Sequence, residues 1–120
     1  MTTDELAGIV MQRIDDLGGG YSFVEMKRDL SRHINVDGDI AIECRPNCIL
    51  WGNVSQAVFE VFDQLWRSET ILLKRVSPMI YVLDGVCSTL PIVKREPKRG
   101  YKKPHWLPVV MCRNDRKEEQ

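Results

Sequence analysis

One apolar stripe near the middle of the chain constrains the fold more than any other feature. Between residues 53 and 66 the apolar side chains recur at the i, i+3, i+4 and i+7 spacing of a single helix face. They are Val54, Ala57, Val58, Val61, Phe62, Leu65 and Trp66. Because this face carries two aromatic and several branched side chains, we expect helix 53–66 to be buried at the centre of the core.

Two further helices are predicted before this stripe. Thr2–Glu5 and Ser22–Glu25 both match the capping box, in which two side chains satisfy backbone N–H groups at a helix start. Apolar residues at helical spacing follow each box, first to Leu17 and then to Ile34. Three glycines, at 18–20, end the first helix because glycine accepts the left-handed conformation of a helix C-cap.

The remaining apolar segments are short and have β character. They are bounded by turn-forming residues, notably Arg45-Pro46-Asn47, Ser77-Pro78 and Asp84-Gly85. This pattern predicts two hairpins and two single strands, the last of them at a sheet edge. The expected strands are 40–44 with 48–51, 71–76 with 79–83, and the single strands 90–93 and 109–112.

This order of elements resembles a winged-helix domain, in which three helices pack together and a β-hairpin forms the wing. The similarity covers residues 3–85, with helix 53–66 as the last helix and 70–83 as the wing. It implies an α+β fold of three helices with two small β-hairpins, winged-helix-like. We expect that domain to span residues 1–93, with a basic strap (residues 94–112) packed on it and a disordered tail at 113–120.

The charge of the chain is zero overall but uneven along its length. Residues 1–63 carry 11 acidic and 5 basic side chains, and residues 64–120 carry 6 acidic and 12 basic ones. The strap opens with six positive charges and one negative charge in ten residues, and its prolines keep it extended. Tyr101 and Trp106 could either stack on bases or cover the core. Because Trp106 and Leu107 favour burial, we expect part of the strap to be ordered on the domain.

Lysine and arginine bind nucleic acid by neutralising its phosphates. We therefore predict a nucleic-acid-binding module that uses the strap, helix 22–34 and the wing. The predicted binding residues are Lys27, Arg28, Arg32, Lys74, Arg75, Lys94, Arg95, Lys98, Arg99, Tyr101, Lys102 and Lys103.

Two features favour a different partner. The exposed face of helix 53–66 would carry Glu60 and Asp63, whose carboxylates repel phosphates. Residues 35–52 also separate the second and third helices by far more than the short turn of a DNA-binding helix-turn-helix. Winged-helix domains serve as protein-interaction modules too, so a protein partner or a second copy of the chain stays open as the alternative.

No pattern in the sequence indicates catalysis or a cofactor. Neither Gly-x-Ser-x-Gly nor His-Glu-x-x-His occurs, so we expect a non-enzymatic protein. Cys44-x-x-x-Cys48 departs from the usual zinc knuckle, and Cys87, Cys112, His33 and His105 are scattered singly, so no metal or other cofactor is expected. A reversible disulfide between Cys44 and Cys48 requires that they face each other across the turn.

The cellular compartment is predicted from two further features. The apolar runs are far shorter than the roughly 20 residues that span a bilayer. The N-terminal residues Met1–Glu5 carry no basic side chain and lack a signal-peptide pattern. We expect a cytoplasmic protein with no membrane contact, in which cysteines are thiols.

Overall fold

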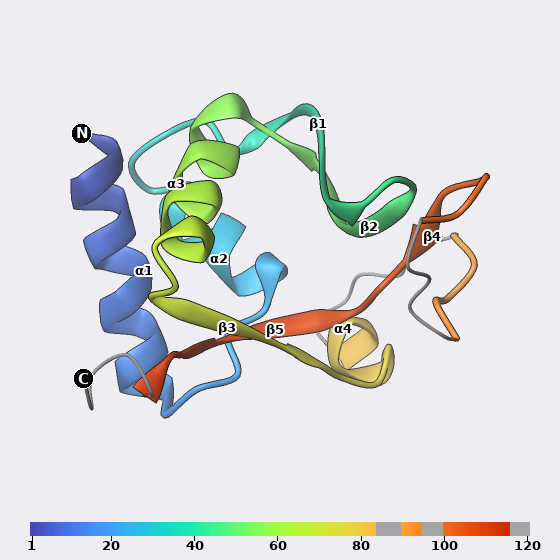
Figure 1. The fold of residues 1–120 in the computed structure, drawn as a ribbon. Helices are drawn as coiled ribbons and strands as arrows, with labels where there is room; N and C mark the ends of the chain where they lie inside the picture. The colour runs from blue at the N-terminus through green and yellow to red at the C-terminus, as the bar shows by residue number, and fades with distance from the viewer. Residues whose placement is uncertain (84–89, 95–99, 116–120) are drawn as a thin grey trace.

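Three helices pack together beside two small β-sheets, which makes the chain an α+β protein as predicted (Figure 1). The structure is a computed structural model and describes residues 1–83, 90–94 and 100–115. The three helices are α1 (Thr3–Leu17), α2 (Phe23–Leu30) and α3 (Gln56–Arg67). The predicted capping boxes of Thr2 and Ser22 begin α1 and α2, and the side chain of Ser55 caps α3.

Helix α3 supplies the centre of the core. Its fully buried side chains are Val58, Val61, Phe62 and Leu65. The ring of Phe62 packs against Phe23 of α2 at a centroid distance of 5.3 Å and against Trp66 at 5.4 Å. The predicted burial of this helix is therefore confirmed, although Val54, the first residue of the stripe, belongs to the preceding strand.

The predicted first hairpin is confirmed and is longer than expected. It consists of β1 (Asp37–Arg45) and β2 (Cys48–Val54), which pair antiparallel. The short strand β4 (His105–Trp106) adds to β2 in parallel, with Cys48 opposite His105. This three-stranded sheet, in the order β1-β2-β4, therefore joins the hairpin to the strap.

The predicted second hairpin is wrong. Strand β3 (Ile71–Arg75) pairs antiparallel with the distant strand β5 (Val109–Arg113), and all five of its residues have partners there. The segment expected to return beside β3 is instead the short helix α4 (Met79–Leu83). The antiparallel ribbon that follows α3 is thus built from two segments far apart in the sequence.

Ser77-Pro78 starts a helix here and does not close a hairpin. The backbone N–H of Met79 donates to the Ser77 hydroxyl at 3.2 Å, and the N–H of Tyr81 donates to the Pro78 carbonyl at 3.1 Å. Serine is a favoured helix cap, and proline suits the first helical position because its missing N–H would be unpaired there anyway. The Ser77-Pro78 pair is therefore compatible with either a turn or a helix start. Because β5 already pairs with β3, the segment after Pro78 does not have to form a strand beside β3.

Strand β5 is an edge strand of a two-stranded sheet, as predicted, and one isolated bridge lies on its other side. On one side it pairs with β3, and on the other side Tyr21 and Met111 exchange backbone hydrogen bonds of 2.9 and 2.7 Å. Arg113, expected in the tail, belongs to β5, and the N–H of Asn114 donates to the Thr70 carbonyl at 3.0 Å. Residues 116–120 of the expected tail lie outside the described residues.

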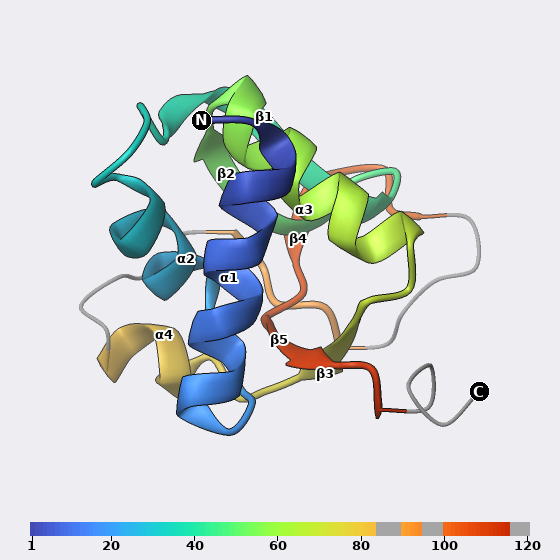
Figure 2. The same cartoon turned by 90° about the vertical axis from the view of Figure 1, so that its left-hand side faces the viewer.

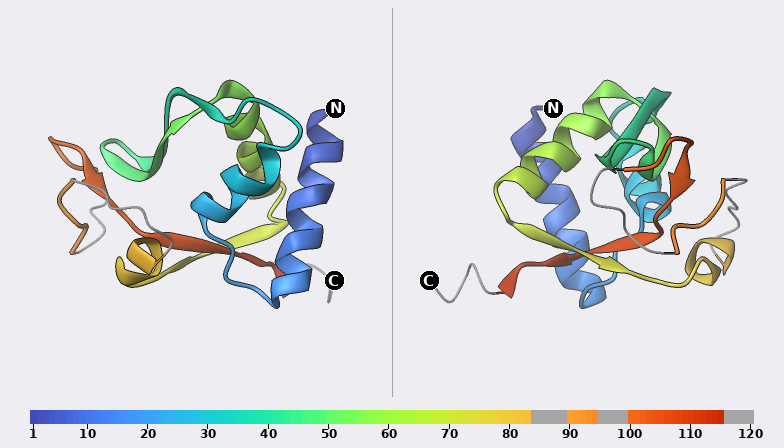
Figure 3. Two further views of the ribbon diagram at one scale, coloured as in Figure 1. Left: turned by 180° about the vertical axis from the view of Figure 1, so that it is seen from behind. Right: turned by 45° about the vertical axis from the view of Figure 1, so that its right-hand side comes forward.

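Helix α1 and strand β4 occupy opposite ends of the molecule (Figure 3). In the view turned by 90° from Figure 1, α1 lies nearest the viewer, with α2 on one side of it and α3 on the other (Figure 2). In the parts of the chain that the structure describes, no helix combines the length and the apolar character that crossing a lipid bilayer requires.

Candidate functional site

The strap is tied to the turn of the β1–β2 hairpin by backbone hydrogen bonds. Tyr101 donates its N–H to the Pro46 carbonyl at 2.9 Å, and His105 donates to the Asn47 carbonyl at 2.8 Å. The Asn47 side chain donates in return to the Tyr101 carbonyl at 2.9 Å. Gly100 has φ +81°, and a Cβ there would lie 2.3 Å from the Pro46 oxygen, so this close approach requires glycine.

Trp106 anchors the strap in the core. Its ring lies 5.2 Å from that of Tyr81 and 6.0 Å from that of Trp51, and its indole N–H donates to the Leu50 carbonyl at 3.2 Å. Trp106 and Leu107 are both buried, as the sequence predicts. A buried tryptophan with its N–H satisfied fixes this part of the strap on the domain and is not available to stack on a base.

The end of β3 joins the strap as well. The Arg75 guanidinium donates to the Val93 carbonyl, and the N–H of Val76 donates to the Pro108 carbonyl at 3.0 Å. Val93 in turn donates its N–H to the Trp106 carbonyl at 2.9 Å. The segment around residue 93, expected as a strand, forms only the isolated bridge of Ile92 with Trp106 among the described pairings.

Five predicted binding residues are exposed on these joined segments, and we call them the strap-side cations. They are Lys74, Arg75, Lys94, Lys102 and Lys103. Within the described ranges, no ion pair joins any of them to a carboxylate. Arg95, Lys98 and Arg99 were predicted with them and lie outside the described residues.

Tyr101 is half-buried, and its ring packs against another side chain. It stacks on the His105 ring with a centroid distance of 3.8 Å and an interplanar angle of 15°. His105 is itself held by a contact of 2.8 Å between Nδ1 and the Lys103 carbonyl. One face of the Tyr101 ring is therefore covered by His105 and is not available to a base.

The structure separates the cations of α2 from those of the strap. The charge of Lys27 is used within the protein, because its ammonium group pairs with Asp37 at 2.9 Å and donates to the Asn53 carbonyl at 3.0 Å. Arg28 and Arg32 are exposed. Since α2 and β4 lie far apart in Figure 1, the described residues do not join the predicted helix 2 cations to the strap.

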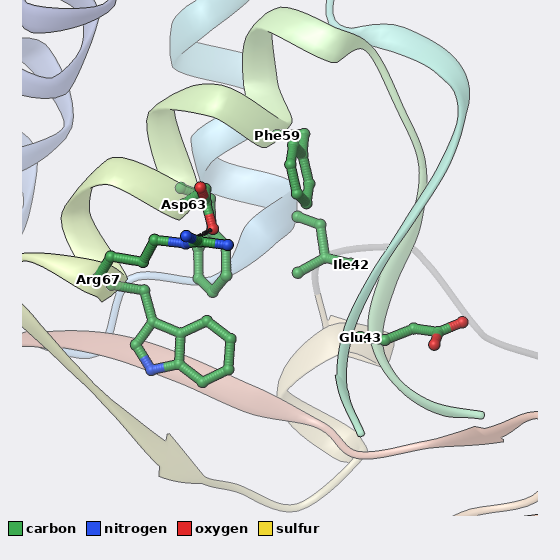
Figure 4. A pocket seen from close by; sticks show the side chains of 7 residues that line it. Ile42, Glu43, Phe59, Asp63 and Arg67 are labelled. Atoms are coloured by element: carbon green, nitrogen blue, oxygen red, sulfur yellow. Dashed lines mark hydrogen bonds and ion pairs between the residues drawn. The ribbon is translucent and has the colours of Figure 1, made fainter. Parts of the chain in front are cut away.

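A surface pocket of about 400 Å³ lies between α3 and β1 (Figure 4). Its lining residues are Ile42, Glu43, Phe59, Phe62, Asp63, Trp66 and Arg67. The Arg67 guanidinium pairs with Asp63 at 2.8 Å across one side of this pocket. The pocket thus combines aromatic walls with one internal ion pair.

This pocket was not predicted from the sequence. The one available signal was Phe59, an aromatic residue that lies outside the apolar stripe of its helix and points toward Ile42 in Figure 4. An aromatic side chain beside the buried stripe needs cover from another element. Here β1 supplies that cover in part, and Phe59 stays half-buried.

A polar cluster joins α1 to α2 and was also missed. The Tyr21 hydroxyl donates to Asp29 at 2.6 Å, and the Arg13 guanidinium donates to the same carboxylate at 3.0 Å. Burial and the hydrogen bond to Asp29 raise the pKa of Tyr21. Burial alone would raise the pKa of Asp29, but the bonds from Tyr21 and Arg13 outweigh it and lower that pKa. The three groups satisfy one another, which indicates a structural role.

The cysteines and histidines are dispersed in the described part of the chain. No three His, Cys, Asp or Glu side chains in those ranges converge as metal ligands would. Cys44 and Cys48 do approach each other, with their Sγ atoms 3.2 Å apart. Cys112 is half-buried on β5, His33 is exposed, and Cys87 lies outside the described residues.

Comparison with known proteins gives no relative: no family model, no curated protein and no solved structure matches this chain.

Proposed function

We propose that the chain is a non-enzymatic, winged-helix-like module that binds the phosphate backbone of nucleic acid through its strap-side cations. The supporting observation is their placement on segments that the fold ties together. Arg75 bonds to Val93 beside Lys94, and the hydrogen bonds of Tyr101 and His105 hold Lys102 and Lys103 on the β1–β2 turn. Exposed cations without carboxylate partners suit phosphate contacts, which position a protein without reading sequence.

The winged-helix resemblance supports this proposal through the ribbon next to α3. Strand β3 follows the last of the three packed helices and pairs antiparallel with β5, in the position that a wing would take. The second strand of this wing is supplied from the strap, after 33 intervening residues. The strap would therefore be part of the wing, and binding would come from the wing.

Helix α3 is unsuited to enter a DNA groove. Its exposed polar side chains are paired with one another or with α1: Gln56 with Glu60 at 3.2 Å, Arg67 with Asp63 at 2.8 Å and Gln64 with Asp4 at 2.7 Å. Carboxylates on this face would also repel phosphates. The proposal therefore assigns no contact with nucleic acid to α3.

Fluorescence anisotropy with labelled duplex and single-stranded DNA tests the proposal. We expect binding at about 50 mM salt that weakens steeply toward 200 mM. The double variant Lys102→Gln/Lys103→Gln should bind roughly tenfold more weakly, a change of about 1.4 kcal/mol.

The variant Arg28→Gln/Arg32→Gln is the matched control, since it removes the same charge from exposed positions on α2 and on the turn that follows it. It should bind within about twofold of the unchanged protein, or about 0.4 kcal/mol. The proposal fails if neither nucleic acid binds at the lowest salt, or if the two double variants weaken binding equally.

The alternative, a protein-interaction or homo-oligomeric module, is favoured by one specific observation. Helix α4 exposes four of its five side chains, all apolar: Met79 (57%), Ile80 (40%), Val82 (44%) and Leu83 (79%). Apolar side chains gathered on a surface often mark a contact with another protein. Multi-angle light scattering distinguishes the two functions: a dimer that Leu83→Ser dissociates supports the alternative, and a monomer over the whole concentration range argues against a homo-oligomer.

A further inference from the structure

Two thiols face each other across the turn of the β1–β2 hairpin, next to a β-bulge. Glu43 pairs with Ile49 and Arg45 pairs with Cys48, so Cys44 is an extra residue on β1. Continued from the Glu43–Ile49 pair, a regular antiparallel ladder would place Cys44 directly opposite Cys48, with both side chains on one face of the sheet. The bulge leaves Cys44 and Arg45 both opposite Cys48, and the Sγ atoms of Cys44 and Cys48 lie 3.2 Å apart.

The turn between the two cysteines holds them in this position. Asn47 adopts φ 57°, a left-handed conformation that asparagine tolerates, and Pro46 has a fixed φ. The strap covers the turn through the hydrogen bonds of Tyr101 and His105. An S–S bond is about 2.05 Å long, so the sulfurs need to approach by only about 1 Å to form one.

The two thiols differ in accessibility. Cys44 is half-buried and reachable from solvent, whereas Cys48 is fully buried behind it. This difference suits a two-step oxidation, in which the accessible sulfur reacts with the oxidant and the buried neighbour resolves the product. Cys112 has no such arrangement with either of them, since it lies on β5 in the other sheet.

We propose that Cys44 and Cys48 form a modification site that a hydroperoxide converts into an intramolecular disulfide. The Cys44 thiolate attacks the peroxide O–O bond and becomes a sulfenic acid, and the leaving hydroxide takes a proton to become water. The Cys48 sulfur then attacks the sulfenic sulfur, the S–O bond breaks, and a second water leaves with the Cys48 proton. Two thiols are oxidised in total, and one hydrogen peroxide molecule is reduced to two waters. This inference does not rest on the proposed function.

Mass spectrometry of the full chain tests the proposal. The reduced protein is treated with a small molar excess of hydrogen peroxide, and the remaining thiols are alkylated under denaturing conditions. Since trypsin does not cleave before Pro46, one peptide, residues 33–67, contains both cysteines. We expect this peptide to lose about 2 Da and to take up no alkyl group, and we expect dithiothreitol to restore both thiols.

The variants provide the controls. Cys44→Ser and Cys48→Ser should each abolish the mass loss in the peptide, and Cys112→Ser should leave it unchanged. Far-ultraviolet circular dichroism checks that the variants are folded. The proposal is overturned if Cys44 and Cys48 remain alkylatable while Cys112 is oxidised, or if the disulfide joins either of them to Cys87, Cys112 or a second chain.

Discussion

Asp29 joins the first two helices through a carboxylate that accepts hydrogen bonds from Tyr21 and Arg13. These bonds lower the pKa of Asp29 from its ordinary value of 3.8. A carboxyl with a lowered pKa in the folded state adds stability above its unfolded pKa, and that stability is lost as the pH falls through the folded value. We therefore expect Asp29→Asn to lower the free energy of unfolding at pH 7 by about 1–2 kcal/mol.

The same variant should change the pH dependence of stability. Urea unfolding between pH 7 and pH 2.5 should show a smaller acid-induced loss for Asp29→Asn than for the unchanged protein. Asp16→Asn is the control, because Asp16 is exposed and bonds only to Gln12 among the described contacts. Parallel acid profiles of the Asp29 variant and the unchanged protein would contradict this account.

Tyr81 carries a second structural hydroxyl, at the contact between α4 and the core. It donates to the Val109 carbonyl at 2.6 Å and accepts the N–H of Phe23 at 3.3 Å, and the residue is fully buried. Tyr81→Phe leaves both backbone groups without this partner, which should cost about 1–3 kcal/mol. Urea unfolding with an unchanged m-value measures this loss, and a change below about 0.5 kcal/mol would show that the hydroxyl is dispensable.

At the scale of elements, β5 connects the strap to strand β3 on one side and to Tyr21 on the other. Met111 is fully buried on β5 between Leu73 and Tyr21. Truncating a buried methionine leaves a cavity, so Met111→Ala should lower the free energy of unfolding by about 2–5 kcal/mol. Met79→Ala removes the same atoms from an exposed position on α4 and should change stability by less than about 0.5 kcal/mol. Equal effects in thermal unfolding would place residue 111 outside the core.

The elements that were predicted correctly are those stabilised by contacts between residues close together in the sequence. The capping boxes of Thr2 and Ser22 and the stripe of α3 lie within single helices, and the β1–β2 hairpin closes over a short turn. Strand β3 differs, because its partner lies in the strap and no local pattern specifies a strand partner so far along the chain. Because β5 is the partner of β3, residues Met79–Leu83 can form the helix that Ser77 and Pro78 favour.

The same distinction applies to the candidate site. Exposure of Lys74, Lys102 and Lys103 could be predicted, since lysine rarely loses contact with water. The pairing of Lys27 with Asp37 and the separation of α2 from the strap could not, because both depend on how distant elements pack. The pocket beside Phe59 likewise depends on tertiary contacts, whereas the approach of Cys44 to Cys48 depends on the local register of one hairpin.

For the whole molecule, the uneven charge of the two halves is only partly neutralised by folding. In the described ranges two ion pairs cross between the halves: Arg67 contacts Asp63 within α3, and Arg113 on β5 contacts Asp15 of α1 with two bonds of 2.7 Å. This contact holds the pKa of Asp15 below its usual value. The strap-side cations have no such partner among the described residues.

This contrast makes a prediction about the salt dependence of nucleic-acid binding. Each cation that contacts a phosphate adds about 0.9 to the slope of log affinity against log salt. Lys102→Gln/Lys103→Gln should therefore reduce that slope by about 1.8, measured by anisotropy with one DNA duplex. Arg113→Gln removes a positive charge as well, but it should leave the slope unchanged because Asp15 already holds that guanidinium. If Arg113→Gln reduced the slope as much per charge as the lysine variants, overall charge and not the strap would determine binding.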